Sequence, residues 1–121
     1  LLDLSRDYQL YVWTARGRNS TLRVLEEGGV ANLFESIYTA DDGVGKPHPL
    51  GLLTLLGPSP KENCLMIGDT TNDIYGARNF SIRSIGVLWN RESSAQTLRD
   101  AGAHFIATDV EECSKLIRLN L

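Results

Sequence analysis

The sequence has no long apolar run, few cysteines and no excess of basic residues, and each absence argues against a class of protein. No apolar stretch approaches the ~20 residues of a membrane-spanning helix, so we expect no membrane partner. The two cysteines, Cys64 and Cys113, lie in apolar patterns, which favours buried thiols and a reducing cytoplasm over a disulfide framework. The 12 Lys and Arg residues are scattered among 15 Asp and Glu, and the net charge of −3 argues against nucleic acid as the main partner.

The remaining composition is typical of a globular protein. Hydrophobic residues make up 42% and charged residues 22% of the 121 positions. This length predicts one domain over residues 1–121, which would bury roughly two thirds of its unfolded surface. We find no repeat, low-complexity tract or interdomain linker, and the sequence does not define an oligomeric state.

Short β-rich runs alternate with helical patterns of about ten residues, which predicts βαβ units and a parallel sheet. Ser93 and Gln96 have the spacing of a capping box, Gly102 is a helix stop, and Asp109 is expected to cap a closing helix. The predicted strands are residues 10–13, 36–38, 65–67, 84–88 and 104–107. The predicted helices that come before the closing helix are residues 20–27, 49–56, 70–79 and 93–101. The residues expected on inner helix faces include Leu22, Leu25, Ile74, Ala77, Val110, Cys113, Leu116 and Ile117.

The segment CLMIGDTTND, residues 64–73, carries the clearest chemical signal. Its apolar strand ends in Gly68, Asp69 follows at the carboxyl end, and Asp73 falls in the first turn of the next helix. Ligand sites of open α/β sheets gather at this edge, where helix N-termini also attract phosphate. Two carboxylates in this position predict a site for a divalent metal.

Two further polar residues follow predicted strands or lie in loops. Thr14 comes directly after the first strand, and Lys46 lies in a Gly-Lys-Pro loop. Because parallel strands share one carboxyl edge, we expect Thr14, Lys46, Asp69 and Asp73 to converge there. The hydroxyl would donate to a phosphoryl oxygen, the ammonium would neutralise its charge, and the carboxylates would hold Mg²⁺.

Each of these residues also has a purely structural interpretation. Thr14 can end its strand or cap the following helix, Lys46 can be a solvated loop lysine, and Asp73 can form a capping box with Thr70. Aspartates such as Asp69 are common in turns. The prediction of a site therefore depends on the order and spacing of all four residues.

Other motifs do not fit. The segment 43–46 resembles the end of a P-loop, but the preceding glycine spacing is wrong and Pro47 stands where Ser or Thr is required. The segment 69–73 lacks the loop glycine and distal Glu of an EF-hand. His48 and His104 have no partners at metal-ligand spacing; we expect His48 to cap or flank the helix that Pro49 opens.

In this order the motifs resemble those of the haloacid dehalogenase (HAD) superfamily of phosphohydrolases. Thr14 resembles its second motif, a Thr or Ser that ends a strand. Lys46 within GKPHP, residues 45–49, resembles the third motif, and GDTTND, residues 68–73, resembles the acidic fourth motif. The resemblance covers about residues 9–117, and the K-P-x-P form is most similar to the phosphoglycolate phosphatase and β-phosphoglucomutase-like branch.

This resemblance implies an α/β fold with a three-layer α/β/α, Rossmann-like parallel sheet. It also implies Mg²⁺-dependent hydrolysis of a small phosphorylated metabolite. Asp69 and Asp73 would bind the metal, Thr14, Ala15 and Lys46 would bind the phosphoryl group, and Lys46 and Asp69 would be the catalytic residues of this chain.

The sequence departs from the family pattern at its beginning. Family enzymes begin with D-x-D-x-T, in which the first Asp forms an aspartyl-phosphate and the second acts as general acid and base. Asp3-Leu4-Ser5 has no second Asp, and the chain opens at Leu1 without Met. We therefore expect a C-terminal portion of the core that lacks the first central strand and the cap, and that is inactive by itself. Ala15-Arg16 and Asn79-Phe80 also depart from the usual motif neighbours.

Two alternatives stay open. The missing first motif motivates a second hypothesis, a non-catalytic HAD-like binding or regulatory module, and the same residues would also suit a phosphomutase. The substrate cannot be named, because the cap that usually selects it is not visible in the sequence.

Overall fold

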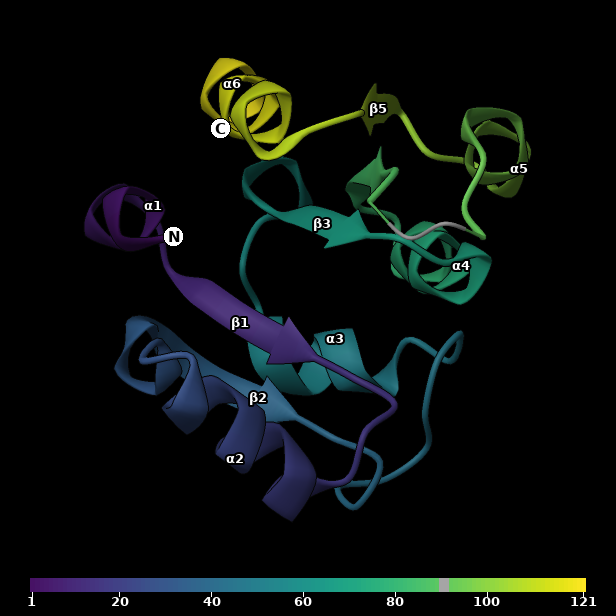
Figure 1. The fold of residues 1–121 in the computed structure, drawn as a ribbon. Coiled ribbons are helices and arrows are strands. Elements are labelled where there is room, and N and C mark those ends of the chain that lie inside the picture. The colour runs from purple at the N-terminus through teal and green to yellow at the C-terminus, as the bar shows by residue number, and fades with distance from the viewer. Residues whose placement is uncertain (90–91) are drawn as a thin grey trace. The chain divides into compact units, whose positions relative to one another are not determined.

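Helices and strands alternate along the chain, as the sequence predicts (Figure 1). The computed structural model describes residues 1–89 and 92–121. Parallel pairing of the strands confirms the α/β fold class. The helices are α1 (Leu2–Asp7), α2 (Arg18–Glu27), α3 (Leu50–Leu56), α4 (Thr71–Asn79), α5 (Ala95–Ala101) and α6 (Val110–Asn120), with short 3₁₀ helices η1 (Ala31–Leu33) and η2 (Lys61–Asn63). The strands are β1 (Leu10–Trp13), β2 (Phe34–Tyr38), β3 (Leu65–Gly68), β4 (Arg83–Val87) and β5 (Phe105–Ala107).

Internal packing divides the chain into two compact units, residues 1–57 and residues 58–121. Each unit has its own parallel sheet: β1 pairs with β2, and β3, β4 and β5 pair in that order. The expectation of a single domain over residues 1–121 stays a prediction.

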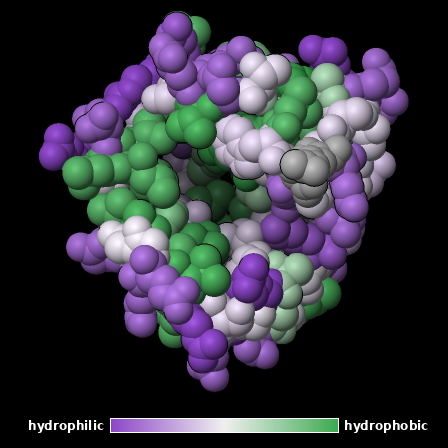
Figure 2. Space-filling model, viewed as in Figure 1, coloured by the Kyte–Doolittle hydropathy of each residue, from purple (hydrophilic) through white to green (hydrophobic). Residues whose placement is uncertain are grey.

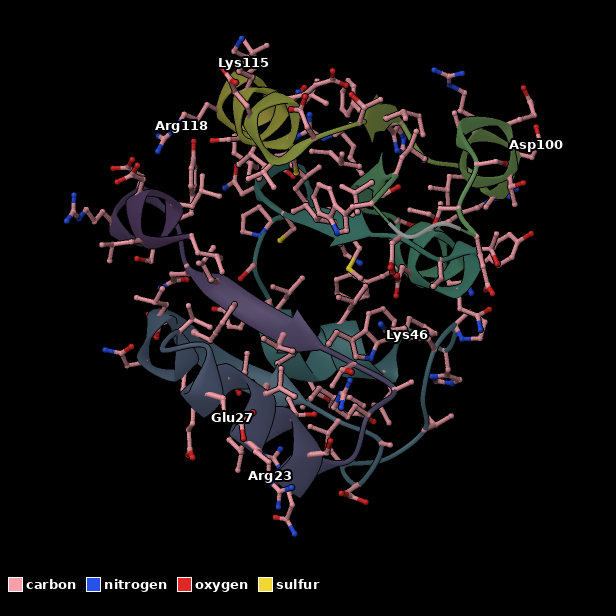
Figure 3. All side chains as sticks on the ribbon, in the orientation of Figure 1. Arg23, Glu27, Lys46, Asp100, Lys115 and Arg118 are labelled. Carbon is pink, nitrogen blue, oxygen red and sulfur yellow. The ribbon has the colours of Figure 1, made fainter. Side chains whose placement is uncertain are left out.

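In the unit of residues 1–57, β1 and β2 run parallel, with Trp13 opposite Tyr38 at their carboxyl ends. Helix α3 packs against both strands. Helix α2 connects the strands, and its exposed side chains include Arg23 and Glu27, labelled in Figure 3. Hydrophilic side chains cover this part of the surface in Figure 2, which is typical of the solvent face of an amphipathic helix.

In the unit of residues 58–121, β4 is the central strand, and residues 84–87 are buried, as expected for a parallel strand covered on both faces. Helices α4, α5 and α6 all pack against it. Ile74 of α4 and Leu98 of α5 are 0% and 1% exposed and form a cluster with Ala101. Burying a side chain of this size contributes about 1.5–3 kcal/mol, so this cluster is a main source of stability for the unit.

Several predicted helix ends are confirmed. Asp109 caps α6, since its Oδ1 accepts a hydrogen bond from the Glu112 N–H at 2.8 Å. Gly102 ends α5 in the left-handed conformation, with φ of 118°. The cap predicted for α5 is wrong: Ser94 accepts from the Thr97 N–H at 3.0 Å, whereas the hydroxyl of Ser93 donates to a backbone carbonyl elsewhere.

Two predicted inner positions are also wrong. Leu22 is 37% exposed, because Thr21 is the buried residue of α2 and the next residue projects about 100° away around the helix. Val110 is 71% exposed, since it is the first residue of α6, while Cys113 and Ile117 form the buried face as predicted. Within the described part of the chain, no helix has both the length and the apolar composition to cross a membrane.

Candidate active site

The turn from β3 into α4 holds Asp69 at the carboxyl end of its strand, as the sequence predicts. Strand β3 ends at Gly68, and Thr70 is the N-cap of α4. A Cβ atom at Gly68 would lie 2.2 Å from the Cβ atom of Asp73, far inside normal contact distance. Glycine is therefore required here so that the strand end and the first turn of the helix can approach each other.

Asp73 closes this turn and is only 5% exposed. Its Oδ2 atom accepts hydrogen bonds from the backbone N–H groups of Asp69 at 3.0 Å and Thr70 at 3.1 Å. Thr70 Oγ1 accepts in return from the Asp73 N–H at 3.3 Å, which completes a capping box. The structural interpretation of Asp73 is thus confirmed, and its role as a metal ligand stays a prediction.

Asp69 has a fixed backbone and an available carboxylate. Its N–H donates to Asp73, and its carbonyl accepts a hydrogen bond from the hydroxyl of Ser93. The Asp69 carboxylate is half-buried and has no hydrogen-bond or ion-pair partner among residues 1–89 and 92–121. This combination suits a ligand that must bind a cation without reorganising the backbone.

In the other unit, Thr14 follows β1 and is held by its neighbours. Its N–H donates to the Tyr38 carbonyl at 3.0 Å, which extends the pairing of the two strands. Its Oγ1 atom accepts a hydrogen bond from the Arg16 N–H at 3.0 Å. Because the oxygen is the acceptor in this bond, the hydroxyl hydrogen points toward a different atom. Ala15 is exposed directly after it, so two of the three residues predicted to bind the phosphoryl group lie at the strand end.

Two aspartates tie the loop after β2 to the start of α2. Asp41 Oδ2 accepts from the Arg18 N–H at 2.7 Å, which satisfies a free donor in the first turn of the helix. Asp42 Oδ2 accepts from the Arg18 guanidinium at 2.6 Å and from both the N–H and the hydroxyl of Thr39 at 2.7 Å. The hydrogen bond from Arg18, followed by those from Thr39, lowers the pKa of Asp42 from its ordinary value of 3.8.

This loop leads to Lys46, whose position Figure 3 labels beside α3. Tyr38 donates from its hydroxyl to the Val44 carbonyl at 3.0 Å, and the Lys46–Pro47 peptide bond is cis. The Lys46 Nζ atom lies over the ring of Trp13, 5.4 Å from its centroid. His48 Nδ1 accepts from the Leu50 N–H at 3.1 Å, which confirms that His48 flanks the start of α3, where Pro49 is the N-cap.

Each unit therefore brings together part of the predicted site. Lys46 contacts the residue that precedes Thr14, and Asp69 and Asp73 share one hydrogen-bonded turn. The convergence of the two pairs into one pocket stays a prediction. Sequence reasoning missed the contacts of Trp13 and Ser93, because no local pattern distinguishes them from other buried or loop residues.

Comparison with known proteins identifies the family. The sequence model of haloacid dehalogenase-like hydrolases matches residues 1–87, which is well over half of the chain. The chain belongs to the haloacid dehalogenase-like hydrolase family.

The relatives of this HAD-family chain are longer than the chain itself. It is 33% identical over 95 residues to a protein of Bacillus velezensis named pyrophosphatase PpaX, covering 75% of the chain and 43% of that relative. It resembles the structure of a hydrolase from Pseudomonas syringae with a TM-score of 0.85 and 24% identity, covering 98% of the chain and 55% of that structure. The structure of a predicted phosphatase from Clostridium acetobutylicum superposes on the chain with a TM-score of 0.78 at 26% identity, covering 94% of the chain and 54% of the length of that structure. The chain thus spans about half the length of the relatives it matches.

The donor atoms of this HAD-family chain fit Mg²⁺ as part of a larger ligand set. Mg²⁺ is commonly held by one or two carboxylates together with water and phosphate oxygens. Asp69 offers such a carboxylate at a strand end. The described residues contain no group of three or more His, Cys, Asp or Glu side chains that would hold a metal by themselves.

Proposed function

We propose that this chain is the C-terminal core portion of a Mg²⁺-dependent phosphatase that hydrolyses a small phosphorylated metabolite. The observation that carries the proposal is the turn at residues 68–73, in which Asp69 has a hydrogen-bonded backbone and a carboxylate without a protein partner among the described residues. Membership of the HAD-like hydrolase family over residues 1–87 supports this reading.

Each proposed site residue would have a separate role in binding the phosphoryl group or the metal. Thr14 would donate its hydroxyl hydrogen to a phosphoryl oxygen, and the exposed segment at Ala15 would accommodate the same group. Lys46 would neutralise phosphoryl charge and orient the attacking carboxylate. Asp69 would bind Mg²⁺ directly, and Asp73 would hold Asp69 in place and support the metal directly or through water. A bound Mg²⁺ would supply charge stabilisation at the phosphoryl oxygens.

The attacking group is proposed to be an aspartate outside this chain, which forms an aspartyl-phosphate intermediate. The absence of a D-x-D-x-T motif from residues 1–121 motivates this part of the proposal. We expect the isolated chain to release no phosphate from p-nitrophenyl phosphate in the presence of Mg²⁺. The buried and unpaired Cys64 and Cys113 support a reducing compartment, the cytoplasm, as the site of action.

The metal site can be tested without turnover by titrating the protein encoded by the full reading frame with Mg²⁺ in a calorimeter, because Asp69 is only one part of the proposed ligand set. The D69N variant is expected to lose most of the binding, because an amide oxygen lacks the negative charge that a hard cation prefers. Asp100, labelled on α5 in Figure 3, provides the matched control: its Oδ1 atom accepts from Gln96 at 2.7 Å, and D100N should bind like the wild type. Equal Mg²⁺ affinity of D69N and the wild type would remove the basis of the proposal.

Activity is tested on the protein encoded by the full reading frame that contains these residues. Phosphate release is measured with p-nitrophenyl phosphate, a panel of sugar phosphates and inorganic pyrophosphate, the last because of the name of the Bacillus velezensis relative. K46A should abolish release, while K115A should not, since Lys115 lies on α6 and pairs only weakly with Glu111 at 3.9 Å. Phosphate moved within a sugar would indicate a mutase, and metal-independent binding without turnover would indicate a non-catalytic module.

A further inference from the structure

The side chain of Trp13 occupies an unusual position beneath Lys46. Trp13 is the last residue of β1 and is 8% exposed. The Lys46 ammonium lies 5.4 Å from the centroid of its ring, within the distance at which a cation is attracted by an aromatic face. Both residues belong to the unit of residues 1–57, so this contact is internal to that unit.

Gly51 of α3 lies against the pyrrole edge of the same ring. A Cβ atom at Gly51 would lie 2.2 Å from Trp13 Nε1 and 2.7 Å from Cε2, distances that no packed side chain tolerates. Helix α3 therefore lies directly against the edge of the indole. The pyrrole edge cannot move toward α3 without displacing the helix backbone, which restricts the orientation of the ring beneath Lys46.

This arrangement leaves a buried donor without an acceptor. Trp13 Nε1 is the buried side-chain nitrogen or oxygen that has no hydrogen-bond partner among residues 1–89 and 92–121. An unpaired buried donor destabilises a fold, and smaller apolar residues at the end of β1 would avoid that cost. Burial alone therefore does not explain a tryptophan here, whereas its ring is the side chain that attracts a cation most strongly.

We propose that Trp13 is a positioning residue that holds the Lys46 ammonium for phosphoryl binding. The inference rests on the proposed function, since it assigns Trp13 a role only through Lys46. The electron-rich ring face limits the directions that the long lysine side chain can take, so less conformational freedom is lost when phosphate binds. Gly51 supports this role by allowing α3 to fix the ring.

The contact itself is tested by NMR on protein labelled with ¹³C-lysine. The ε-methylene protons of Lys46 should resonate upfield of those of Lys115, which is 74% exposed and serves as the internal reference. The W13L variant should remove this upfield shift, because leucine has no ring current. An unchanged Lys46 signal in W13L would overturn the contact and the proposal with it.

The role is tested by replacing Trp13 with mono-, di- and trifluorotryptophan in the protein from the full reading frame. Fluorine changes the shape of the ring little but withdraws electrons from its face, so a role in packing alone would leave phosphate binding unchanged across the series. W13F protein grown with the same amino acids controls for fluorination at other tryptophans, such as the exposed Trp89.

Affinity for inorganic phosphate should fall stepwise with fluorination, by about two- to fivefold in total. Constant affinity across the series, with K46A still abolishing binding, would overturn the role of Trp13 and leave the proposed function standing. Equal phosphate affinity of K46A and the wild type would instead overturn the proposed function, and the role of Trp13 along with it.

Discussion

Replacing Gly68 with alanine should disrupt the turn that presents Asp69. The new Cβ atom would lie 2.2 Å from Asp73 Cβ and 2.7 Å from Asp73 Cγ and Oδ2. Carbon atoms pack at about 3.5–4.0 Å, so the first turn of α4 must move by more than an ångström. Such a shift breaks the hydrogen bonds that Asp73 accepts at 3.0 and 3.1 Å.

The expected loss of stability follows from those bonds. Hydrogen bonds to a charged acceptor contribute about 1.5–3 kcal/mol each, and alanine regains about 0.5–1 kcal/mol over glycine in a strand. Partial relaxation of the helix would preserve some of the stabilisation from the two hydrogen bonds. We therefore expect G68A to lower the free energy of unfolding of the unit of residues 58–121 by about 2–4 kcal/mol.

Urea unfolding followed by circular dichroism and by the fluorescence of Trp89 measures this change in the unit that contains it. Gly45 offers a matched control, since a Cβ atom there would meet nothing within 4 Å and its backbone conformation is open to any residue. G45A should unfold like the wild type and bind Mg²⁺ normally, whereas G68A should also bind Mg²⁺ more weakly. A G68A protein within about 0.5 kcal/mol of G45A would refute the account of the turn.

The remaining predictions concern a charge and a helix cap. Arg18 and Thr39 lower the pKa of Asp42 in the folded protein. The Asp42 carboxylate therefore stabilises the fold fully at pH values above its unfolded pKa of 3.8, and this stabilisation is lost as the pH falls through the lower pKa of the folded state. D42N should therefore be less stable than the wild type at pH 6, and the two urea midpoints should converge near pH 2; a constant difference would contradict this. S94A should lose about 1 kcal/mol and S94D should restore it, since Ser94 caps α5 through the Thr97 N–H. Equal midpoints for S94A and the wild type would show that this cap has no effect on stability.

Local sequence patterns predicted most of the fold correctly. The alternation of β-rich runs and helical patterns located β1 to β5 and α2 to α6 to within a few residues, because these elements depend on short-range periodicity. Helix α1 and the 3₁₀ helices η1 and η2 were not predicted; α1 is six residues long, and none of the three buries a residue. The capping box of Thr70 and Asp73 was also predictable, since its hydrogen bonds join residues three positions apart.

The N-cap of α5, where Ser93 and Ser94 are adjacent, could not be predicted from local sequence alone. Both have the side chain of a good N-cap, and the sequence favoured Ser93 through its spacing from Gln96. In the structure the Ser93 hydroxyl donates a hydrogen bond to the carbonyl of Asp69, 24 positions earlier, and Ser94 is the N-cap of α5. A contact that joins distant segments decided between two residues that are locally equivalent.

The sequence by itself determined the element order, the caps of α4 and α6, and the motif residues Thr14, Lys46, Asp69 and Asp73, because spacing along the chain is enough to define them. Only the tertiary structure decided that Trp13 contacts both Gly51 and Lys46, 38 and 33 positions away in the sequence. No periodicity encodes such a contact. It arises because parallel strands and the helix packed on them bring distant residues to the same strand end.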